Sequence, residues 1–236
     1  MQPLPDGALA TLAALDGATI RTVRVGLLLP WANTAVETEL PRFGLANTVF
    51  HYARLVPASR TTAIDSSFWH GLRSASAGAL DSLSHLPLDA VVLACTSAGF
   101  TGGPGLPDDV VTAFDALLGA LAGSGASRVV LATPYPASVT EAESGTLTAS
   151  GIEVLAQASL GLDDGYADVA PDQILELVGQ LPEKAVRAAD AVVLSCTGWH
   201  TLPVLAELER RFGKPVFSSN LAMALLAARV HASVAS

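Results

Sequence analysis

Two stretches of this sequence share one pattern: residues 89–97 read DAVVLACTS, and residues 190–198 read DAVVLSCTG. Each is a short apolar run, rich in β-branched residues, that ends at Cys-Thr and continues into a segment containing glycine. Such a run is typical of a buried parallel strand that leads into a loop. Cys95 and Cys196, the only cysteines in the chain, are therefore expected at two strand ends. In open α/β sheets ligands bind outside the carboxyl ends of the strands, so both thiols are expected at a functional site.

Packing, a disulfide and a metal site are the alternative roles for the two cysteines. A buried cysteine is often only a packing residue. A structural disulfide needs an oxidising compartment, and nothing in the sequence indicates export. A zinc site would need two further ligands, and the chain has no Cys-x-x-Cys or paired histidine spacing, so no metal is expected. Two cysteines in matching contexts favour a functional pair.

Composition narrows the class of protein. The 236 residues suffice for one large domain or two small ones, and 50% hydrophobic with 15% charged residues predicts a well-buried α/β protein. A net charge of −9 argues against nucleic acid or an anionic membrane as a partner. An anionic substrate can still bind through backbone N–H groups. Without a basic signal-peptide segment or an apolar stretch long enough for a membrane span, we expect a cytoplasmic protein.

Strand and helix patterns alternate along the chain, which predicts parallel sheets built from βαβ units. Thr34 and Glu37 have the spacing of a capping box at the start of the second expected helix. Strands are expected at residues 23–29, 48–56, 89–95, 128–133, 152–158, 190–196 and 215–217. Helices are expected at residues 8–15, 34–40, 65–86, 108–121, 137–148, 172–188, 201–212 and 220–231.

The repeated motif predicts two similar halves. We expect a leader at residues 1–21, a first α/β half at residues 22–123 and a second at residues 124–213. The first sheet is short of strands on this division. The last strand and helix, from about 214 to 236, are therefore expected to cross back and complete the first half.

An ordered set of motifs resembles one known family. The set comprises VGLLLPWANT at 25–34, ACTS at 94–97, TPY at 133–135, SCT at 195–197 and GKPVFSSN at 213–220. Together these are similar to the maleate cis–trans isomerase and arylmalonate decarboxylase branch of the aspartate/glutamate racemase superfamily. The resemblance implies two pseudo-symmetric parallel α/β halves, an active site between them, and neither cofactor nor metal. It also implies a homodimer or a higher homo-oligomer acting on a small carboxylate or dicarboxylate.

The resemblance also implies roles for individual residues. Cys95 would be the nucleophile that adds to the alkene of maleate, and Cys196 would serve the opposite face as acid or base. Donors around the strand-end loops are expected to lower the thiol pKa toward neutrality. The substrate-binding positions implied are Asn33, Thr96, Ser97, Tyr135, Thr197 and Gly198.

The family pattern is not matched throughout. Arylmalonate decarboxylases keep only the second cysteine, so the presence of both favours isomerase or racemase chemistry. Maleate isomerases have an asparagine in the loop after the strand at 152–158, and here residues 162–168 read LDDGYAD. Trp31 and Phe100 are expected to add apolar surface to the pocket, whereas Phe68 is expected in the core or at a subunit contact. A racemase, an arylmalonate-type decarboxylase of a substituted malonate or amino-acid derivative, and a non-catalytic carboxylate-binding protein remain the alternatives.

Overall fold

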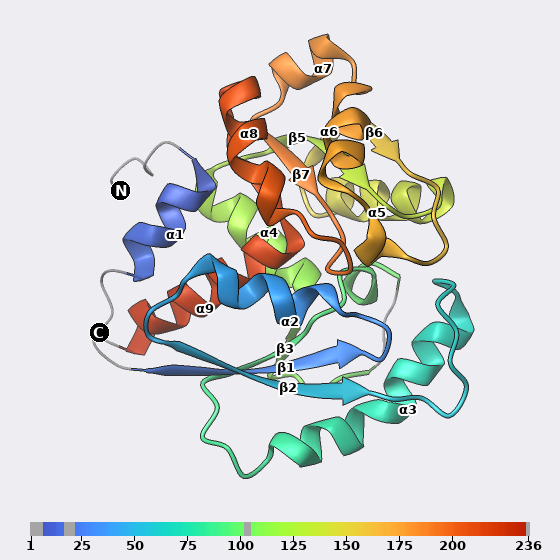
Figure 1. The fold of residues 1–236 in the computed structure, drawn as a ribbon, viewed down its shortest axis with the longest axis vertical. Coiled ribbons are helices and arrows are strands. Elements are labelled where there is room, and N and C mark those ends of the chain that lie inside the picture. Colours follow the sequence, from blue (N-terminus) through green and yellow to red (C-terminus); the bar gives the residue numbers. More distant parts are fainter. Residues whose placement is uncertain (1–6, 17–21, 102–104, 235–236) are drawn as a thin grey trace.

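The computed structural model describes residues 7–16, 22–101 and 105–234 (Figure 1). The rest of the expected leader, residues 1–6 and 17–21, lies outside the described residues. Within the first part of the chain the elements are α1 (Ala8–Asp16), β1 (Val23–Pro30), α2 (Ala35–Glu39), η1 (Leu40–Phe43), β2 (Thr48–Leu55), α3 (Ser66–Leu83), β3 (Ala90–Leu93), η2 (Ser97–Gly99), β4 (Val110–Thr112) and α4 (Ala113–Ser124). They are followed by β5 (Arg128–Thr133), α5 (Ala137–Ala149), β6 (Glu153–Ser159), η3 (Tyr166–Asp168), α6 (Pro171–Gly179), α7 (Glu183–Ala188), β7 (Ala191–Leu194), α8 (Leu202–Phe212), β8 (Val216–Ser218) and α9 (Ser219–Val234).

The strands form two parallel four-stranded sheets with the same topology. Their orders are β2-β1-β3-β4 and β6-β5-β7-β8, and every pairing within them is parallel. In register, Val25 pairs with Ala90 in the first sheet and Val129 with Ala191 in the second. The repeated motif thus occupies the same strand, third in sequence order, of each sheet. This confirms the predicted α/β class with two similar parallel sheets.

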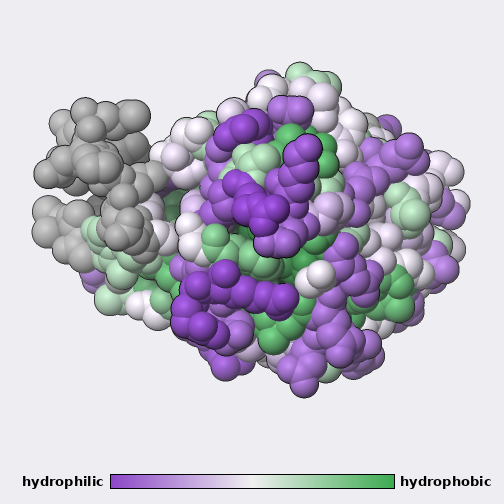
Figure 2. Space-filling view, turned by 90° about the horizontal axis from the view of Figure 1, so that it is seen from above, coloured by the Kyte–Doolittle hydropathy of each residue, from purple (hydrophilic) through white to green (hydrophobic). Residues whose placement is uncertain are grey.

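Helices cover the sheets and join them. Helix α3 packs on one face of the first sheet, where Leu72 and Leu83 are buried in a core of their own (Figure 1). Helices α4 and α9 pack against each other on the other side, and α9 contacts β1 and β3 of the first sheet as well as β8 of the second. One continuous hydrophobic core therefore runs through both halves. The face shown in Figure 2 is mainly hydrophilic, with smaller hydrophobic areas between.

The last strand corrects one prediction. β8 pairs with β7 in the second sheet, so it does not cross back to complete the first. The first sheet instead gains its fourth strand from β4, which the sequence patterns missed because it is only three residues long. Only α9 returns to the first sheet. The helix expected at 108–121 accordingly begins later, at Ala113, behind a capping box formed by Thr112 and Asp115.

Two other predicted helices also need correction. The single helix expected at 172–188 is two helices, α6 and α7, because Pro182 has no N–H to continue the first and stands at the N-cap of the second. At the start of α2 the Thr34 side chain makes no capping hydrogen bond. Asn33 caps the helix instead, since its Oδ1 accepts from the N–H groups of Ala35 and Val36 at 3.1 Å.

The N-terminal helix is part of the packed structure. Helix α1 confirms the helix predicted at 8–15, and it packs beside α9 (Figure 1). The backbone N–H of Ala8 donates to Glu209 of α8 at 2.8 Å. Among the described helices none is both long and apolar enough to cross a membrane.

Candidate active site

A cavity of about 260 Å³ lies at the carboxyl ends of the strands of both sheets. The loops after β1, β3, β5 and β7 all contribute to its wall, which is where parallel sheets place ligand sites. It is lined by all eight residues that the sequence predicted for the site: Asn33, Cys95, Thr96, Ser97, Tyr135, Cys196, Thr197 and Gly198. Residues from the two halves, up to 165 positions apart, thus meet around one small space.

Cys95 is a buried free thiol in the loop after β3. Its Sγ lies 3.6 Å from the Ser97 hydroxyl. Burial raises the pKa of Cys95, while the Ser97 hydroxyl and the backbone N–H groups of Ala98 and Ser97 act to lower it. Three donors therefore face this sulfur, and each would interact more strongly with a thiolate than with a thiol.

Cys196 is a buried free thiol in the loop after β7, with a different environment. Burial raises its pKa to about 12, against a hydrogen bond with Tyr135 and one from the N–H of Gly198, which lies 3.1 Å from Sγ. At φ 142° Cys196 is the one non-glycine residue in the described ranges with a positive φ. A side chain in this region costs roughly 1–3 kcal/mol, and such strain is found mostly at functional sites.

The expectation that the loop donors would bring the thiol pKa down toward neutrality is wrong for both cysteines. Burial dominates at each site and raises the pKa above the ordinary value. Removing a thiolate from water disfavours the charged form more than a few donors compensate. Both thiols are therefore protonated at neutral pH in this structure, and the thiolate fraction grows as the pH rises.

Hydrogen bonds between the two halves hold the cysteine loops together. Thr197 donates to the carbonyl of Ala94 at 2.9 Å, and Thr96 donates to the hydroxyl of Ser219 at 2.9 Å. Ser219 in turn accepts from the N–H of Cys196 at 3.1 Å. The two threonines predicted as substrate contacts therefore also fix one half of the site against the other.

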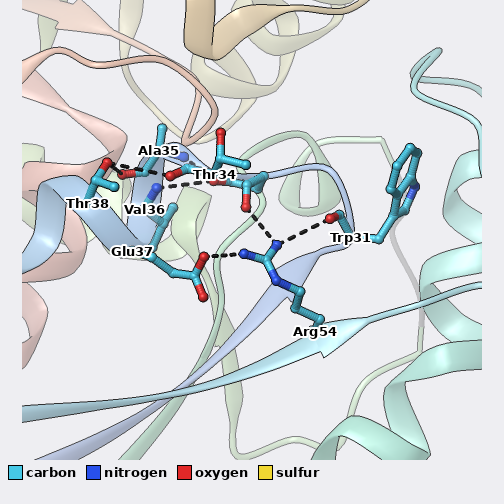
Figure 3. A network of polar contacts seen from close by, with 8 residues as sticks. Trp31, Thr34, Ala35, Val36, Glu37, Thr38 and Arg54 are labelled. Atoms are coloured by element: carbon cyan, nitrogen blue, oxygen red, sulfur yellow. Dashed lines mark hydrogen bonds and ion pairs between the residues drawn. The ribbon is translucent and has the colours of Figure 1, made fainter.

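Asn33 also has a structural role. Its Nδ2 donates to Thr197 at 3.0 Å while its Oδ1 caps α2, which leaves one amide hydrogen for a ligand. Arg54 of β2 fixes the same loop from outside by donating to the carbonyls of Trp31 and Asn33, and it pairs with Glu37 (Figure 3). Glu37, predicted as a capping-box residue, is engaged by this ion pair instead.

Tyr135 lines the cavity beside the second cysteine. The side chain is 2% exposed, and its hydroxyl is hydrogen-bonded with the thiol of Cys196. Burial raises the pKa of Tyr135 well above its ordinary value, with the Cys196 sulfur adding to the effect. The ring is held edge-on by Phe100 and Tyr166, with centroids at 6.4 and 5.7 Å. Tyr135 is therefore a rigid, neutral donor beside the second cysteine.

A buried carboxyl lies behind Cys196. Glu143 of α5 is fully buried and accepts a hydrogen bond from the hydroxyl of Ser195, the residue before the cysteine. Its other oxygen has no partner. Burial raises the pKa of Glu143 to about 8, against the Ser195 hydrogen bond. When Glu143 is ionised, its negative charge would raise the pKa of both Cys196 and Tyr135. Its protonation state therefore affects these two groups.

The apolar wall of the cavity differs from the prediction. Ile64 and Phe68 line it, whereas Trp31 and Phe100 do not. Phe100 packs edge-on between Phe114 and Tyr135, behind the site. Phe68 lies in the first turn of α3, where its N–H donates to the N-cap Asp65, and it lines the cavity from this end of the helix. A helix pattern alone does not show which of its apolar residues lies at a cavity mouth.

The loop after β6 supplies lining residues that the sequence motifs did not assign to the site. Asp164, Gly165, Tyr166, Ala167 and Asp168 all line the cavity. Gly165 adopts φ 70°, a left-handed conformation that glycine accepts readily, and it starts the short helix η3. The family comparison drew attention to this loop through the asparagine that residues 162–168 lack, but it named none of these five residues as part of the site.

The family profile of arylmalonate decarboxylase matches residues 97–234, more than half of the chain. The chain belongs to this family. Maleate isomerase from Geobacillus stearothermophilus is 28% identical over 226 residues, with 83% of this chain and 86% of that protein covered. Arylmalonate decarboxylase from Bordetella bronchiseptica is 35% identical over 118 residues, with 49% of this chain and 48% of that protein covered.

Two similar solved structures share the fold. A cysteine-to-serine mutant of the Nocardia farcinica maleate cis-trans isomerase, with a covalently bound succinylcysteine intermediate, superposes with a TM-score of 0.78 at 24% identity, covering 89% of this chain and 92% of that one. A glycine-to-cysteine mutant of arylmalonate decarboxylase superposes with a TM-score of 0.72 at 26% identity, covering 89% and 93%. This family member thus has the fold that the sequence predicted.

Proposed function

We propose that this family member is a cofactor-independent cis–trans isomerase acting on a small cis-unsaturated carboxylic acid of the maleate type. The observation that carries the proposal is the pair of thiols, Cys95 and Cys196, which reach one cavity from equivalent strand ends of two sheets. The similarity to maleate isomerases, 28% and 27% identical over more than four fifths of the chain, supports it. The eight residues that line the cavity and were predicted from sequence are proposed as its site.

The two thiols suit a reaction by addition and elimination. Cys95 first releases its proton to water. Its thiolate then attacks one alkene carbon and forms a C–S bond, and the π electrons move to the neighbouring carbon. Cys196 gives its proton to that carbon and becomes a thiolate. The central bond is now single and can rotate. Cys196 then takes a proton back while the C–S bond breaks, which restores the alkene in the trans form and the Cys95 thiolate.

The surroundings of each cysteine fit these roles. The donors at Cys95 come from Ser97 and Ala98 and stabilise a sulfur anion, as a nucleophile and leaving group requires. A thiol with a pKa of about 12 holds its proton at neutral pH, and its thiolate is a strong base. Cys196 can therefore give and retake one proton. Tyr135 stabilises the Cys196 thiolate between these two steps through its hydrogen bond.

The carboxylate that receives charge during addition also needs donors. The free amide hydrogen of Asn33 is available at the cavity, and the Ser97 hydroxyl is free to donate once the Cys95 sulfur is bonded to carbon. Preoriented donors of this kind lower a barrier by roughly 3 kcal/mol each. None of the described lining residues is Lys, Arg or His, so recognition of the acid depends on hydrogen bonds rather than on an ion pair.

Proton NMR of the purified protein with maleate in deuterated buffer tests the proposal. Formation of fumarate that stops in a Cys95→Ala variant is the expected result. Maleate left unchanged would contradict the proposal. Substituted malonates and amino-acid derivatives in the same assay separate the rivals: carboxylate loss that depends on Cys196 alone indicates a decarboxylase, and deuterium at an α-carbon indicates a racemase. Binding without turnover indicates a carboxylate-binding protein.

Three further properties are part of the proposal. The organisation into two α/β halves that share the active site rests on the two sheets of identical strand order. A homodimer or higher homo-oligomer and a cytoplasmic location rest on the family similarity and on two free thiols. Sedimentation velocity of the purified protein tests the assembly, and a monomer at micromolar concentration would contradict it.

A further inference from the structure

Tyr166 is held rigidly at the cavity, close to both cysteines. Its ring meets that of Tyr135 edge-on, with centroids 5.7 Å apart and planes at 85°. It also packs on Gly198, where an added Cβ would lie 3.1 Å from the ring and 3.3 Å from the Cys196 sulfur. Negative charge on Cys196 or on Cys95 would raise the pKa of its hydroxyl. The position of this side chain is thus set by the site itself.

The hydroxyl of Tyr166 is buried and has no hydrogen-bond partner in the protein. Burial raises the pKa of Tyr166 well above its ordinary value, and the charges of Cys196, Asp163 and Asp164 add to the effect. The group is therefore neutral and is a hydrogen-bond donor at every working pH. A buried donor without a partner costs roughly 1–3 kcal/mol, a cost that a ligand acceptor at this point would remove.

Two carboxylates line the same cavity as the Tyr166 side chain. Asp164 and Asp168 line the cavity beside Tyr166, and Asp164 Oδ1 already accepts from the N–H of Gly165 at 2.7 Å, which orients the carboxylate. A negatively charged end group would meet these carboxylates with no cation among the described lining residues to balance them. At close range two like charges repel by about 1 kcal/mol or more, even in water.

A donor beside a carboxylate matches one common chemical group. A carboxamide has a carbonyl oxygen that accepts and an NH₂ that donates, whereas a carboxylate only accepts. The Tyr166 hydroxyl would donate to the carbonyl, and Asp164 would accept from the NH₂. Donors elsewhere on the cavity wall, from Ser97 and Asn33, suit the remaining carboxylate.

We propose that the part of the cavity wall formed by Tyr166 and Asp164 binds an uncharged carboxamide, so that the preferred substrate is the half-amide of a cis-enedioic acid rather than the dianion. This inference rests on the isomerase function proposed above, and it names the substrate class. The reaction is unchanged: Cys95 adds, the central bond rotates and Cys95 leaves, with the amide group intact throughout.

Turnover and binding together test the inference. Proton NMR gives kcat/KM for maleamate and for maleate with the wild-type protein. Calorimetry gives the Kd of succinamate and of succinate, which have no double bond and cannot isomerise. We expect kcat/KM to favour maleamate by about tenfold or more, and succinamate to bind more tightly than succinate by a similar factor.

Variants then assign the preference to residues. Tyr166→Phe should raise KM for maleamate about tenfold with little change in kcat, and leave maleate nearly unaffected. Asp164→Asn should improve the kcat/KM for maleate. Tyr52→Phe removes another buried tyrosine hydroxyl that has no partner but lies away from this cavity, and Asp172→Asn removes an exposed charge elsewhere. Neither control should alter the preference.

The outcomes separate this inference from the proposed function. If maleate is isomerised at least as well as maleamate, the isomerase proposal stands and the carboxamide site is wrong. If neither acid is isomerised but succinamate binds more tightly than succinate, the carboxamide site stands and the isomerase proposal falls. Equal binding, no binding of either analogue, or equal losses for both acids in Tyr166→Phe would overturn the inference.

Discussion

The two cysteine loops start from the same sequence pattern and the same strand position, yet their surroundings differ. Cys95 has an ordinary backbone conformation and three donors around its sulfur. Cys196 has a φ of 142°, a hydrogen bond with Tyr135 and a buried carboxyl behind it. A repeated fold unit thus supplies two thiols, and the neighbours of each determine which one suits a nucleophile and which an acid.

A pair of buried glutamates shows the same divergence. Sheet registers place Val25 and Val129 at equivalent positions, and with this offset Glu39 of α2 matches Glu143 of α5. Glu39 accepts from the N–H of Leu202 and from Asn220, so it connects the two halves. Among the residues that the structure describes, Glu143 accepts from Ser195 alone, and its other oxygen has no partner. The first glutamate therefore has a structural role, while the second can influence Cys196.

The largest expected effect separates the two thiols directly. Cys95→Ala should lower kcat/KM by at least about 10³-fold, because the covalent step is lost. Cys196→Ser should also be slow but should accumulate the adduct on Cys95. Intact-protein mass spectrometry detects it as a mass increase of one substrate molecule. An adduct in Cys95→Ala, or none in Cys196→Ser, would reverse the assignment.

Tyr135→Phe should reduce kcat by about 10²-fold, since it removes the donor that stabilises the Cys196 thiolate. The effect should be confined to Cys196, the proposed acid, and should not extend to Cys95. Alkylation of Cys95 by iodoacetamide, measured in the Cys196→Ser background, should proceed at the same rate with and without Tyr135→Phe. A slower Cys95 would show that the tyrosine acts on both cysteines.

Burial of Cys95 predicts how the reactivity of its thiol depends on pH. Its folded pKa is raised, so the reactive thiolate should increase about tenfold per pH unit through pH 8.5, the ordinary value for a thiol, and should level off only above it. Iodoacetamide alkylation of the Cys196→Ser variant, followed by mass spectrometry from pH 6 to 10, measures this. A plateau below pH 8 would show that the loop donors outweigh burial.

Backbone strain should distinguish the two loops in stability. Cys196→Gly should be more stable than Cys196→Ala by roughly 1–3 kcal/mol, because glycine accepts the positive φ. Cys95→Gly should be less stable than Cys95→Ala by up to about 1 kcal/mol, because its backbone is not in that region. Urea unfolding of the four variants makes the comparison, and the same order at both positions would argue against strain at Cys196.

The last prediction concerns Glu143 and the pH dependence of stability. Its folded pKa of about 8 exceeds the unfolded value of 4.5, so the folded state binds more protons between these pH values. The free energy of unfolding should therefore fall as the pH rises from 4.5 to 8, by up to about 1.4 kcal/mol per unit. Glu143→Gln should flatten this slope. Glu141→Gln, an exposed position on the same helix, should leave it unchanged, and equal slopes in all three proteins would contradict the raised pKa.

Local patterns were enough for most elements, because an apolar strand and an amphipathic helix each carry their own period. They failed where an element is short or where a single residue sets its boundary. β4 has three residues, Pro182 divides one expected helix into two, and Asn33 caps α2 in place of Thr34. Strand order was a second limit, since nothing local tells β8 to pair with β7 rather than with the first sheet.

The sequence by itself determined the two thiols and their strand-end positions, because the repeated motif is contiguous in the chain. The family resemblance named the other six residues around the cavity. Only the tertiary structure decided their chemistry. The raised pKa of each thiol comes from burial, and the hydrogen bonds of Thr96, Thr197 and Asn33 come from the other half. Tyr166 and Asp164 reach the cavity on a loop that the family comparison marked only by a missing asparagine. Desolvation and contacts between distant segments depend on the packed fold, and no local pattern encodes them.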